Sequence, residues 1–402
     1  MSGAVFDRMA AALGEAVSQD RDGLPRVAPR STDGLATALG IAHEHHWRIR
    51  IEGRATWMPA DAPADLALTT ARLDRIVSIA PQDLVATVQA GATMRELARQ
   101  FGEHRTWLAL DPPGSPDRSL GSVLATGTAG PARHRFGPVK DHVLGTTVVS
   151  SDGRVIRSGG VVVKNVAGFD LSKVQIGGFG AFGVVAEINL RLRAVPAARQ
   201  LLVATGELDP LFHAGRALVE ADVDAEMVEL VSPAVTGAAG WLLVVMIAGT
   251  EPGVVAEVER ARSTVPDRRL ETRPINSLAP AIAQAFGEGP VTIRAGALPA
   301  STPDLVDLFA ETLGSGRIAA SLGRGGIRWA GAPSIQNIRR LRALLAEREI
   351  PLTLERAPWP IRSAVGHFGA FREGVKPLTG RVREVFDPGL LLVTALEEAN
   401  DA

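Results

Sequence analysis

The chain has 402 residues, 46% hydrophobic and 22% charged, which is typical of a soluble globular protein long enough for two domains. Its formal net charge of -1 excludes a strong overall field for nucleic acid or an anionic membrane. Cysteine and tyrosine are absent, which excludes disulfides, cysteine-ligated metal sites and catalytic phenols. We expect no metal site, and redox chemistry would need an organic cofactor and an electron acceptor outside the chain.

No segment has the pattern of a membrane span or of a signal peptide. The longest strongly apolar run, Trp241–Ala248, is too short to cross a bilayer. The first twenty residues include Asp7, Arg8, Glu15 and Asp20, so they form no signal-peptide core. We expect a cytoplasmic protein without a transmembrane segment, with any peripheral contact to the inner membrane made through partner proteins.

The first half of the chain alternates helical and strand patterns. The expected elements are a helix at Thr32–His46, strands at Trp47–Ile51 and Asp83–Ala90, and a hairpin of Val143–Ser150 with Arg154–Ser158. Thr93 and Glu96 form a capping box that opens a helix to Phe101. The stretch Ala109–Gly137 is rich in Gly, Pro, Ser and Thr, and we expect it to be irregular.

Gly178–Gly183 matches the dinucleotide-binding pattern G-x-G-x-x-G letter for letter. In a Rossmann unit this turn opens a helix, and a ribose-binding acid follows about 20 residues later. Here the cleanly alternating Val184–Arg193 predicts a half-buried strand instead, and Glu187 comes too early. The sequence therefore favours a glycine-rich turn where backbone or a flat ligand approaches closely.

After about residue 200, apolar strand-like runs alternate with helical stretches. The strand-like runs are Glu226–Val231, Trp241–Ile247, Val291–Ala295 and Ile327–Ala330. The helical stretches are Leu211–Glu220, Val254–Arg262, Pro303–Leu313 and Ser334–Glu347. This alternation predicts a second α+β domain with an antiparallel sheet. The expected boundaries are 1–199, 200–360 and 361–402, with the last segment returning to the first domain.

Three irregular glycine-bearing segments lie in the first half: Glu52–Trp57, Asp111–Gly137 and Val161–Gly183. Such backbone offers N–H groups at close range, which suits a diphosphate, although each segment alone also fits an ordinary loop. Two runs carry a family resemblance, LALDPPGSPDRSLGSVLATGTAGPARHRFGPVKDHVLGTTVVSSDGRV at Leu108–Val155 and GGVVVKNVAGFDLSKVQIGGFGAFGVVAEINLRLRAVP at Gly159–Pro196.

These runs resemble the FAD-binding domain of the vanillyl-alcohol-oxidase and p-cresol-methylhydroxylase (PCMH) family. Within it the chain looks like the FAD-binding subunit of bacterial glycolate oxidase, of which the run Lys164–Asp170 is typical. The resemblance implies an α+β fold, in which a two-subdomain PCMH-type FAD-binding domain precedes an α+β cap domain with an antiparallel sheet.

The resemblance also implies which residues hold FAD. Gly53, Arg54, Ala55, Thr56 and Trp57 would wrap the diphosphate. Further residues would line the flavin and ribityl chain or contact the adenine half: Asp111, Pro112, Leu120, Gly121, Ser122, Ala125, Thr126, Gly130, Arg135, Gly137, Val184 and Ile188. The first loop contains no histidine where covalently flavinylated relatives carry one, so non-covalent binding is expected.

The chain departs from the family pattern at two places. The first loop has Glu52 and Arg54 where the family has consecutive glycines. A carboxylate there repels a diphosphate unless it points away or Arg54 compensates. The C-terminal Asn-Pro-Gly-Arg signature is also missing, and Phe386–Gly389 stands in its place.

Oxidising a 2-hydroxy acid requires a proton acceptor and a cation for the carboxylate. No catalytic base is evident, because the histidine-rich motif of the related catalytic subunits is absent. His134 is a better placed candidate than the histidines at 43–46, which fit a solvated helix face. Arg294, Arg324 and Arg328 lie on or beside strands, where a pair of them would clamp a carboxylate or form ordinary salt bridges.

By the resemblance, the chain is the FAD-binding subunit of a glycolate (2-hydroxyacid) oxidase or dehydrogenase complex. It would pass electrons to a catalytic FAD subunit and an iron–sulfur subunit, and nucleic acid is not an expected partner. Two other functions stay open: a non-catalytic scaffold subunit of that complex, and a stand-alone flavin-dependent oxidase that uses oxygen.

Overall fold

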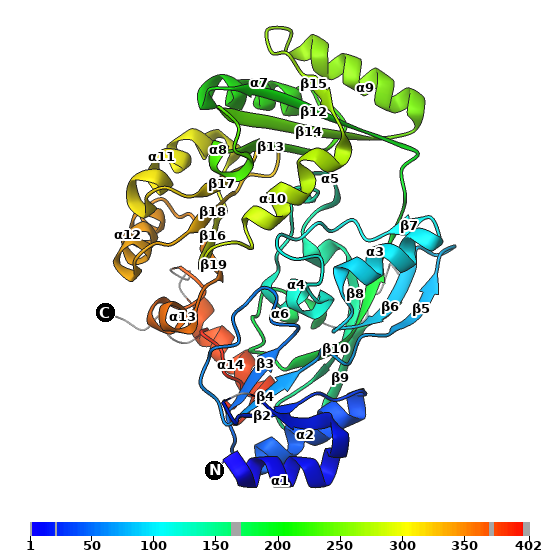
Figure 1. The fold of residues 1–402 in the computed structure, drawn as a ribbon, viewed down its shortest axis with the longest axis vertical. Helices are drawn as coiled ribbons and strands as arrows, with labels where there is room; N and C mark the ends of the chain where they lie inside the picture. The colour runs from blue at the N-terminus through cyan, green and yellow to red at the C-terminus, as the bar shows by residue number, and fades with distance from the viewer. Residues whose placement is uncertain (1, 21, 162–169, 370–373, 397–402) are drawn as a thin grey trace.

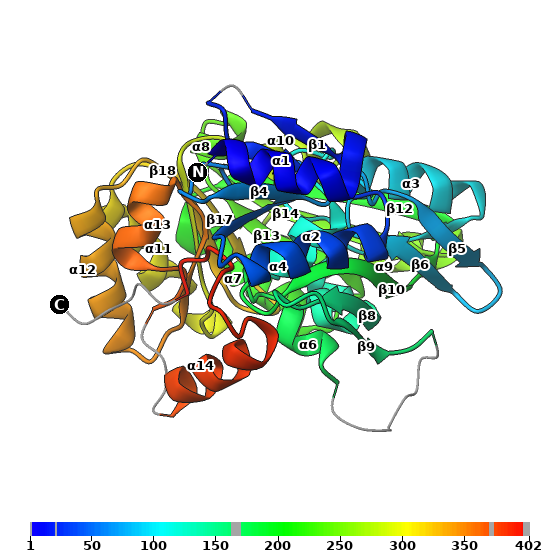
Figure 2. The ribbon, with the colours of Figure 1, turned by 90° about the horizontal axis from the view of Figure 1, so that it is seen from below.

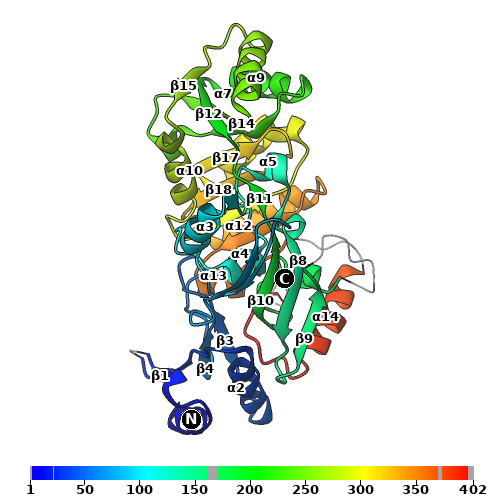
Figure 3. The same cartoon turned by 90° about the vertical axis from the view of Figure 1, so that its right-hand side faces the viewer.

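The computed structural model of the chain describes residues 2–20, 22–161, 170–369 and 374–396. The N-terminal half lies in the lower part of Figure 1, and most of the second half forms the upper part of an elongated molecule, whereas the red C-terminal segment lies beside the lower part. The side view in Figure 3 shows the same division, with the N-terminal helix farthest from the upper sheet.

The first subdomain is a four-stranded sheet in the order β1-β2-β4-β3. Its strands are β1 Val17–Gln19, β2 Pro25–Val27, β3 Ile49–Glu52 and β4 Leu66–Thr69. Parallel pairing of β4 with β2 and β3 requires crossovers, and helix α2 (Thr32–Glu44) supplies one of them. Helix α1 (Ser2–Leu13) packs beside α2, followed by the 3-10 turn Gly14–Ala16, as Figure 2 shows from below.

The second subdomain is a five-stranded antiparallel sheet in the order β5-β6-β10-β8-β9. Its strands are β5 Ile76–Ala80, β6 Val85–Gln89, β8 Val143–Val149, β9 Val155–Gly159 and β10 Val184–Arg191. Around it lie α3 Met94–Glu103, α5 Arg133–Phe136, α6 Ser172–Gln175, the 3-10 turn Val139–Asp141 and the short pair β7 Thr106–Trp107 with β11 Arg193–Ala194. Of the expected capping box, the Thr93 half is present, because the Thr93 hydroxyl accepts a hydrogen bond from the Glu96 N–H at 3.1 Å. The Glu96 carboxylate binds Arg99 and Gln100 instead of completing the box.

Part of the stretch expected to be irregular is helical. Helix α4 spans Leu120–Thr126, with Ser119 accepting the Ser122 N–H at its start. Gly127, with φ of 60°, ends the helix in the left-handed conformation. Seven residues are too few to show an apolar period, which explains why the pattern suggested only a loop.

The second half is built on an eight-stranded sheet in the order β15-β12-β14-β13-β17-β18-β16-β19, antiparallel at every pair for which a register is defined. The strands are β12 Ala198–Gly206, β13 Ala225–Val231, β14 Trp241–Gly249, β15 Glu271–Arg273, β16 Val291–Ala295, β17 Arg317–Ser321, β18 Ile327–Gly331 and β19 Leu352–Arg356.

Helices cover both faces of this sheet. One face packs against α7 Leu208–Glu220, α9 Glu251–Thr264, α11 Thr302–Leu313 and α12 Ile335–Ala346. The other face packs a smaller cluster that includes α10 Ala279–Ala285, with α8 Pro233–Thr236 beside it. The remaining short elements are the 3-10 turns Ile275–Ser277 and Pro299–Ser301 and helix α13 Trp359–Val365. The predicted α+β class with an antiparallel second sheet is confirmed.

The C-terminal segment runs back to the first sheet after helix α14 (Val375–Phe386). Ile49 donates its N–H to Leu391 at 2.8 Å and accepts the Val393 N–H at 2.9 Å. Asp387, where the family signature is missing, accepts the N–H groups of Leu391 and Leu392 and so fixes this turn. None of the described helices has both the length and the apolar character needed to cross a bilayer.

Candidate functional site

A cleft of about 1100 Å³, measured to its open mouth, lies between the two N-terminal subdomains. We call it the first cavity. The loop after β3, one face of α4, the glycine-rich turn before β10 and the returning C-terminal segment line it. The Rossmann-like letters Gly178–Gly183 therefore form a turn in its wall, and the strand β10 that follows them agrees with the rejection of a Rossmann unit.

The loop after β3 presents a row of free backbone amides to this cavity. Among the described residues, nothing accepts a hydrogen bond from the N–H groups of residues 53–58. Ala55 has a φ of 52°, a left-handed conformation that lets neighbouring N–H groups converge. All six residues line the cavity. Converging amides of this kind fit a diphosphate without a cationic side chain.

The charge of Glu52, at the base of this loop, is neutralised by two arginines. Its carboxylate is buried and lies 2.7 Å from the guanidinium groups of both Arg26 and Arg50. Arg54 does not take this role, because it donates to the carbonyl of Gly91 at 2.9 Å and to Asp74 at 3.1 Å. The charge of Glu52 is therefore compensated by Arg26 on β2 and Arg50 on β3, and not by Arg54.

An aromatic pair forms another wall of the first cavity. The rings of Phe179 and His367 stack with centroids 3.8 Å apart. Burial lowers the pKa of His367 to about 3, so its ring is neutral, and one nitrogen lies 2.9 Å from the Leu354 carbonyl. A neutral aromatic face suits an adenine ring. The glycines of this turn predicted a close approach of backbone or of a flat ligand, but Phe179 between them was not predicted as a site residue.

A second cavity, of about 750 Å³ measured to its open mouth, lies between the segment Asp111–Arg133 and the upper sheet. Arg294 and Arg328 line it, but both bind the buried carboxylate of Glu355, at 2.9 and 2.8 Å. Burial alone would raise the pKa of Glu355, yet the two guanidinium groups bring it below its usual value. The two arginines are therefore committed to an internal carboxylate.

Two further carboxyl groups face this second cavity, those of the half-buried Asp111 and the buried Glu229. Burial raises the pKa of each to about 7, even though Ala132 donates its N–H to Asp111 at 3.0 Å. Arg133 lines the same cavity, and burial together with the nearby Arg294 lowers its pKa. Several ionisable side chains with shifted pKa values therefore lie close together in the lining of the second cavity.

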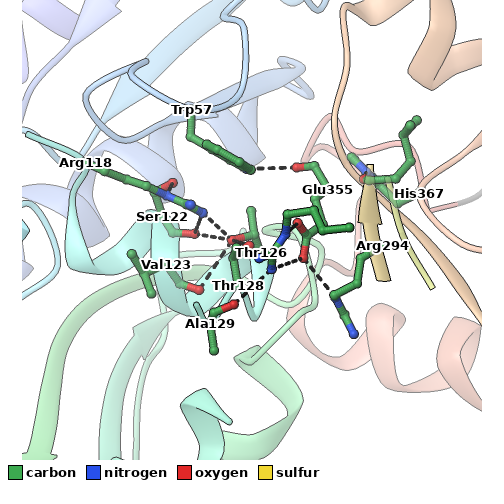
Figure 4. Close-up of polar contacts among 12 residues, drawn as sticks. Trp57, Arg118, Ser122, Val123, Thr126, Thr128, Ala129, Arg294, Glu355 and His367 are labelled. Atoms are coloured by element: carbon green, nitrogen blue, oxygen red, sulfur yellow. Dashed lines mark hydrogen bonds and ion pairs between the residues drawn. The ribbon is translucent and has the colours of Figure 1, made fainter. Parts of the chain in front are cut away.

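Trp57 and Arg118 lie where the two cavities approach each other. The Arg118 guanidinium lies 4.2 Å from the centroid of the Trp57 ring, and the indole N–H donates to the Glu355 carbonyl at 2.9 Å. Figure 4 shows Trp57 reaching toward Glu355, with Arg118 extending toward Thr126.

The structure distributes the other predicted site residues over three places. In the lining of the first cavity are Gly53, Arg54, Ala55, Thr56, Trp57, Gly121, Ser122, Ala125, Thr126 and Val184. In the lining of the second are Asp111, Gly130, Arg294 and Arg328. Outside both linings are Pro112, Leu120, His134, Arg135, Gly137, Ile188 and Arg324.

Local contacts explain the residues outside the linings. Leu120 and Ile188 are buried in the core of the second subdomain. Arg135 binds Asp224 at 2.8 Å on another surface, and Gly137, with φ of 85°, ends α5. Burial lowers the pKa of His134, whose carbonyl accepts a hydrogen bond from Arg324. Of the run 164–170, only residue 170 falls within the described part of the chain.

Comparisons with known proteins agree with this geometry. Residues 25–159 match a family model described as FAD binding domain. The chain is 29% identical over 184 residues to glycolate oxidase subunit GlcD of Bacillus subtilis (strain 168), covering 45% of this chain and 39% of that one. It is 36% identical over 124 residues to glycolate oxidase subunit GlcE of Escherichia coli (strain K12), covering 31% and 35%. The chain thus spans well under half the length of these relatives.

A third relative is the mitochondrial D-lactate dehydrogenase [cytochrome] of Arabidopsis thaliana, 30% identical over 173 residues, covering 42% of this chain and 30% of that one. Among solved structures, substrate-bound p-cresol methylhydroxylase superposes with a TM-score of 0.77 at 13% identity, covering 100% and 98% of the two chains. Alkyldihydroxyacetonephosphate synthase superposes with a TM-score of 0.71 at 14% identity, covering 96% and 85%. The predicted PCMH-type fold is confirmed, and the expected FAD-binding domain is matched.

Proposed function

We propose that this chain is the FAD-binding subunit of a complex that oxidises 2-hydroxy acids of the glycolate type. The observation that carries the proposal is the row of six free amides at residues 53–58, inside the segment that matches an FAD-binding domain. The relatives named as glycolate oxidase subunits and D-lactate dehydrogenases support the substrate class.

In this proposal, different residues of the first cavity bind different parts of the cofactor. The N–H groups of residues 53–58 hold the diphosphate, and Phe179 offers its ring to the adenine. Arg26 and Arg50 keep Glu52 from repelling the phosphates. When bound, FAD supplies a two-electron acceptor. We propose non-covalent binding, because the loop Glu52–Trp57 has no His at the place where covalently flavinylated relatives carry one.

The absence of cysteine supports a division of labour among subunits. Because the chain has no cysteine, it holds no cysteine-ligated cluster, and electrons from a bound flavin would have to pass to clusters carried elsewhere. A catalytic FAD subunit and an iron–sulfur subunit are therefore the proposed partners. The complex would lie in the cytoplasm, with any contact to the inner membrane made by those partners.

A second candidate function is a non-catalytic scaffold subunit of the same complex. The pairing of Arg294 and Arg328 with Glu355 favours it, because these cations are no longer free to clamp a substrate carboxylate. In this case the chain keeps the fold and the nucleotide site, and a partner performs the oxidation.

The test is to add FAD to the purified full-length chain, remove free flavin and record the visible spectrum. Flavin bands that persist, and that leave the protein on denaturation, support the proposal, whereas a protein that gains no bands contradicts it. Bleaching of those bands by glycolate would exclude the scaffold. Hydrogen peroxide release without partners would instead indicate a stand-alone oxidase. A flavin count on the co-purified native complex would then assign the flavins to their subunits.

A further inference from the structure

The two cavities are separate, and a pair of side chains closes the passage between them. Among the described residues, no residue lines both. Arg118 spans the wall: it donates to Thr126 of the first lining at 2.6 Å and to the Pro113 carbonyl of the second at 3.0 Å. Its side chain is fully buried. It therefore lies inside the wall and not on either surface.

Trp57 fills the rest of this wall and is held on several sides. The indole is 2% exposed and covers the Arg118 guanidinium. Its N–H is fixed by the Glu355 carbonyl, and a Cβ placed on Gly114 would lie 2.8 Å from its ring. The positive φ of Gly114, 102°, lets the backbone approach the ring so closely. On the side away from the first cavity, the indole is therefore held by Arg118, Gly114 and the Glu355 carbonyl.

The Arg118 guanidinium depends on the indole for part of its contacts. Burial lowers the pKa of Arg118 to about 9, since no carboxylate touches it. Its donors are satisfied by Ser122, Thr126 and the Pro113 carbonyl, and the indole covers its face. Arg328 continues the wall on the side of the second cavity, bridging Glu355 and the Ala129 carbonyl at 2.9 Å. Moving the indole would remove the cation–π contact on the face of this guanidinium.

We infer that the Trp57–Arg118 pair keeps the isoalloxazine ring of a bound FAD out of the second cavity, so that this chain grips its cofactor by the adenosine diphosphate part alone. A flat tricyclic ring is larger than the indole that already fills the passage. The inference rests on the proposed function, because it concerns the same cofactor in the same first cavity. It makes the charged second cavity a structural region of this subunit and not its substrate site.

The experiment compares the binding of ADP and of FAD to the full-length chain by calorimetry. Because the ring adds no contacts, the two Kd values should agree within about threefold. The flavin fluorescence of the bound FAD should also remain quenchable by iodide. FAD binding about tenfold or more tighter than ADP, with a protected flavin, would overturn the inference while leaving the proposed function intact. Binding of neither compound would remove both.

Substitution of the indole gives the second arm. Trp57→Ala opens the passage, so FAD should then bind about tenfold tighter relative to ADP than in the wild type. Trp107→Ala is the matched control, because Trp107 also stacks on an arginine, Arg199, at 4.4 Å but lies outside both linings. If a folded Trp57→Ala protein kept the wild-type ratio of the FAD and ADP Kd values, this would contradict the exclusion of the flavin ring by the indole. If that variant does not fold, the wild-type comparison still decides.

Discussion

The two cavities lie on either side of the wall that Trp57 and Arg118 form. The polar groups of the first are mainly backbone N–H groups, whereas those of the second are mainly charged side chains. The first is lined by backbone N–H groups, small residues and a neutral aromatic pair, and its one buried carboxylate is compensated from behind the loop. The second gathers three arginines around Asp111 and Glu229, with Glu355 behind them. Backbone dipoles do not titrate, whereas side-chain charges do. Ligand binding in the first should therefore depend on loop geometry, and stability around the second should depend on pH.

The largest effect should follow from Glu355→Gln. This change leaves Arg294 and Arg328 buried without their shared carboxylate, which costs about 3–5 kcal/mol of unfolding free energy. Urea unfolding monitored by tryptophan fluorescence measures it. Glu347→Gln, at an exposed position on the same half, is the control and should change stability by less than about 0.5 kcal/mol. Equal stability of the two variants would show that the buried ion pairs contribute little.

Asp111→Asn should reveal the pH dependence of the second cavity. The pKa of Asp111 is raised to about 7 in the folded protein, above its unfolded value of 3.8, because burial disfavours the charged form. Between these values only the folded state holds the proton, so stability falls as pH rises toward 7. The variant should gain about 2 kcal/mol over the wild type between pH 5 and pH 7.5. Parallel stability profiles in urea would contradict the burial of an ionisable group here.

Gly53→Ala should weaken FAD binding about tenfold in the first cavity. A Cβ at this position would lie 2.5 Å from the Ser119 hydroxyl, so the amide loop must move away from α4. The double variant Gly53→Ala with Ser119→Ala removes that clash and should recover most of the affinity, although it loses the helix cap. If the hydroxyl deletion restores nothing in a titration with FAD, the loop position does not set the affinity.

Arg26→Ala should have the smallest effect on FAD binding. Arg50 still pairs with Glu52, so only part of the compensation is lost, and affinity should fall about threefold. Because this is a charge effect, the loss should shrink at high salt. Arg72→Ala, an exposed arginine of the same subdomain, is the control and should bind FAD like the wild type. A loss that is independent of salt would point to altered loop structure.

Local patterns predicted much of the fold. The alternation of β10 and the Thr93 cap at the start of α3 depend on neighbouring residues, and both are present in the structure. Helix α4 and strands β17 and β19 were not predicted, because they are short and lie among glycine-rich or charged stretches. Their conformation depends on packing between distant segments, which a single sequence does not display.

The candidate site was predictable only in part, for the same reason. The glycine-bearing loop at residue 53 could be recognised because its composition is local. The compensation of Glu52 from Arg26, 26 positions earlier, could not. Trp57 meets Glu355 across 298 positions, and this contact holds the indole in the wall between the cavities. Sequence patterns indicated which backbone segment would have free N–H groups. Which side chains pair across the chain could be seen only once the fold was known.

The most direct measurement is a titration of the full-length chain with FAD, with Gly53→Ala as the comparison. We predict uptake of one FAD per chain, release of intact FAD on denaturation, and weaker binding by the variant. A wild-type chain that takes up no flavin, or that binds it as well after the loop is displaced, would contradict the claim that the free amides of residues 53–58 hold the cofactor.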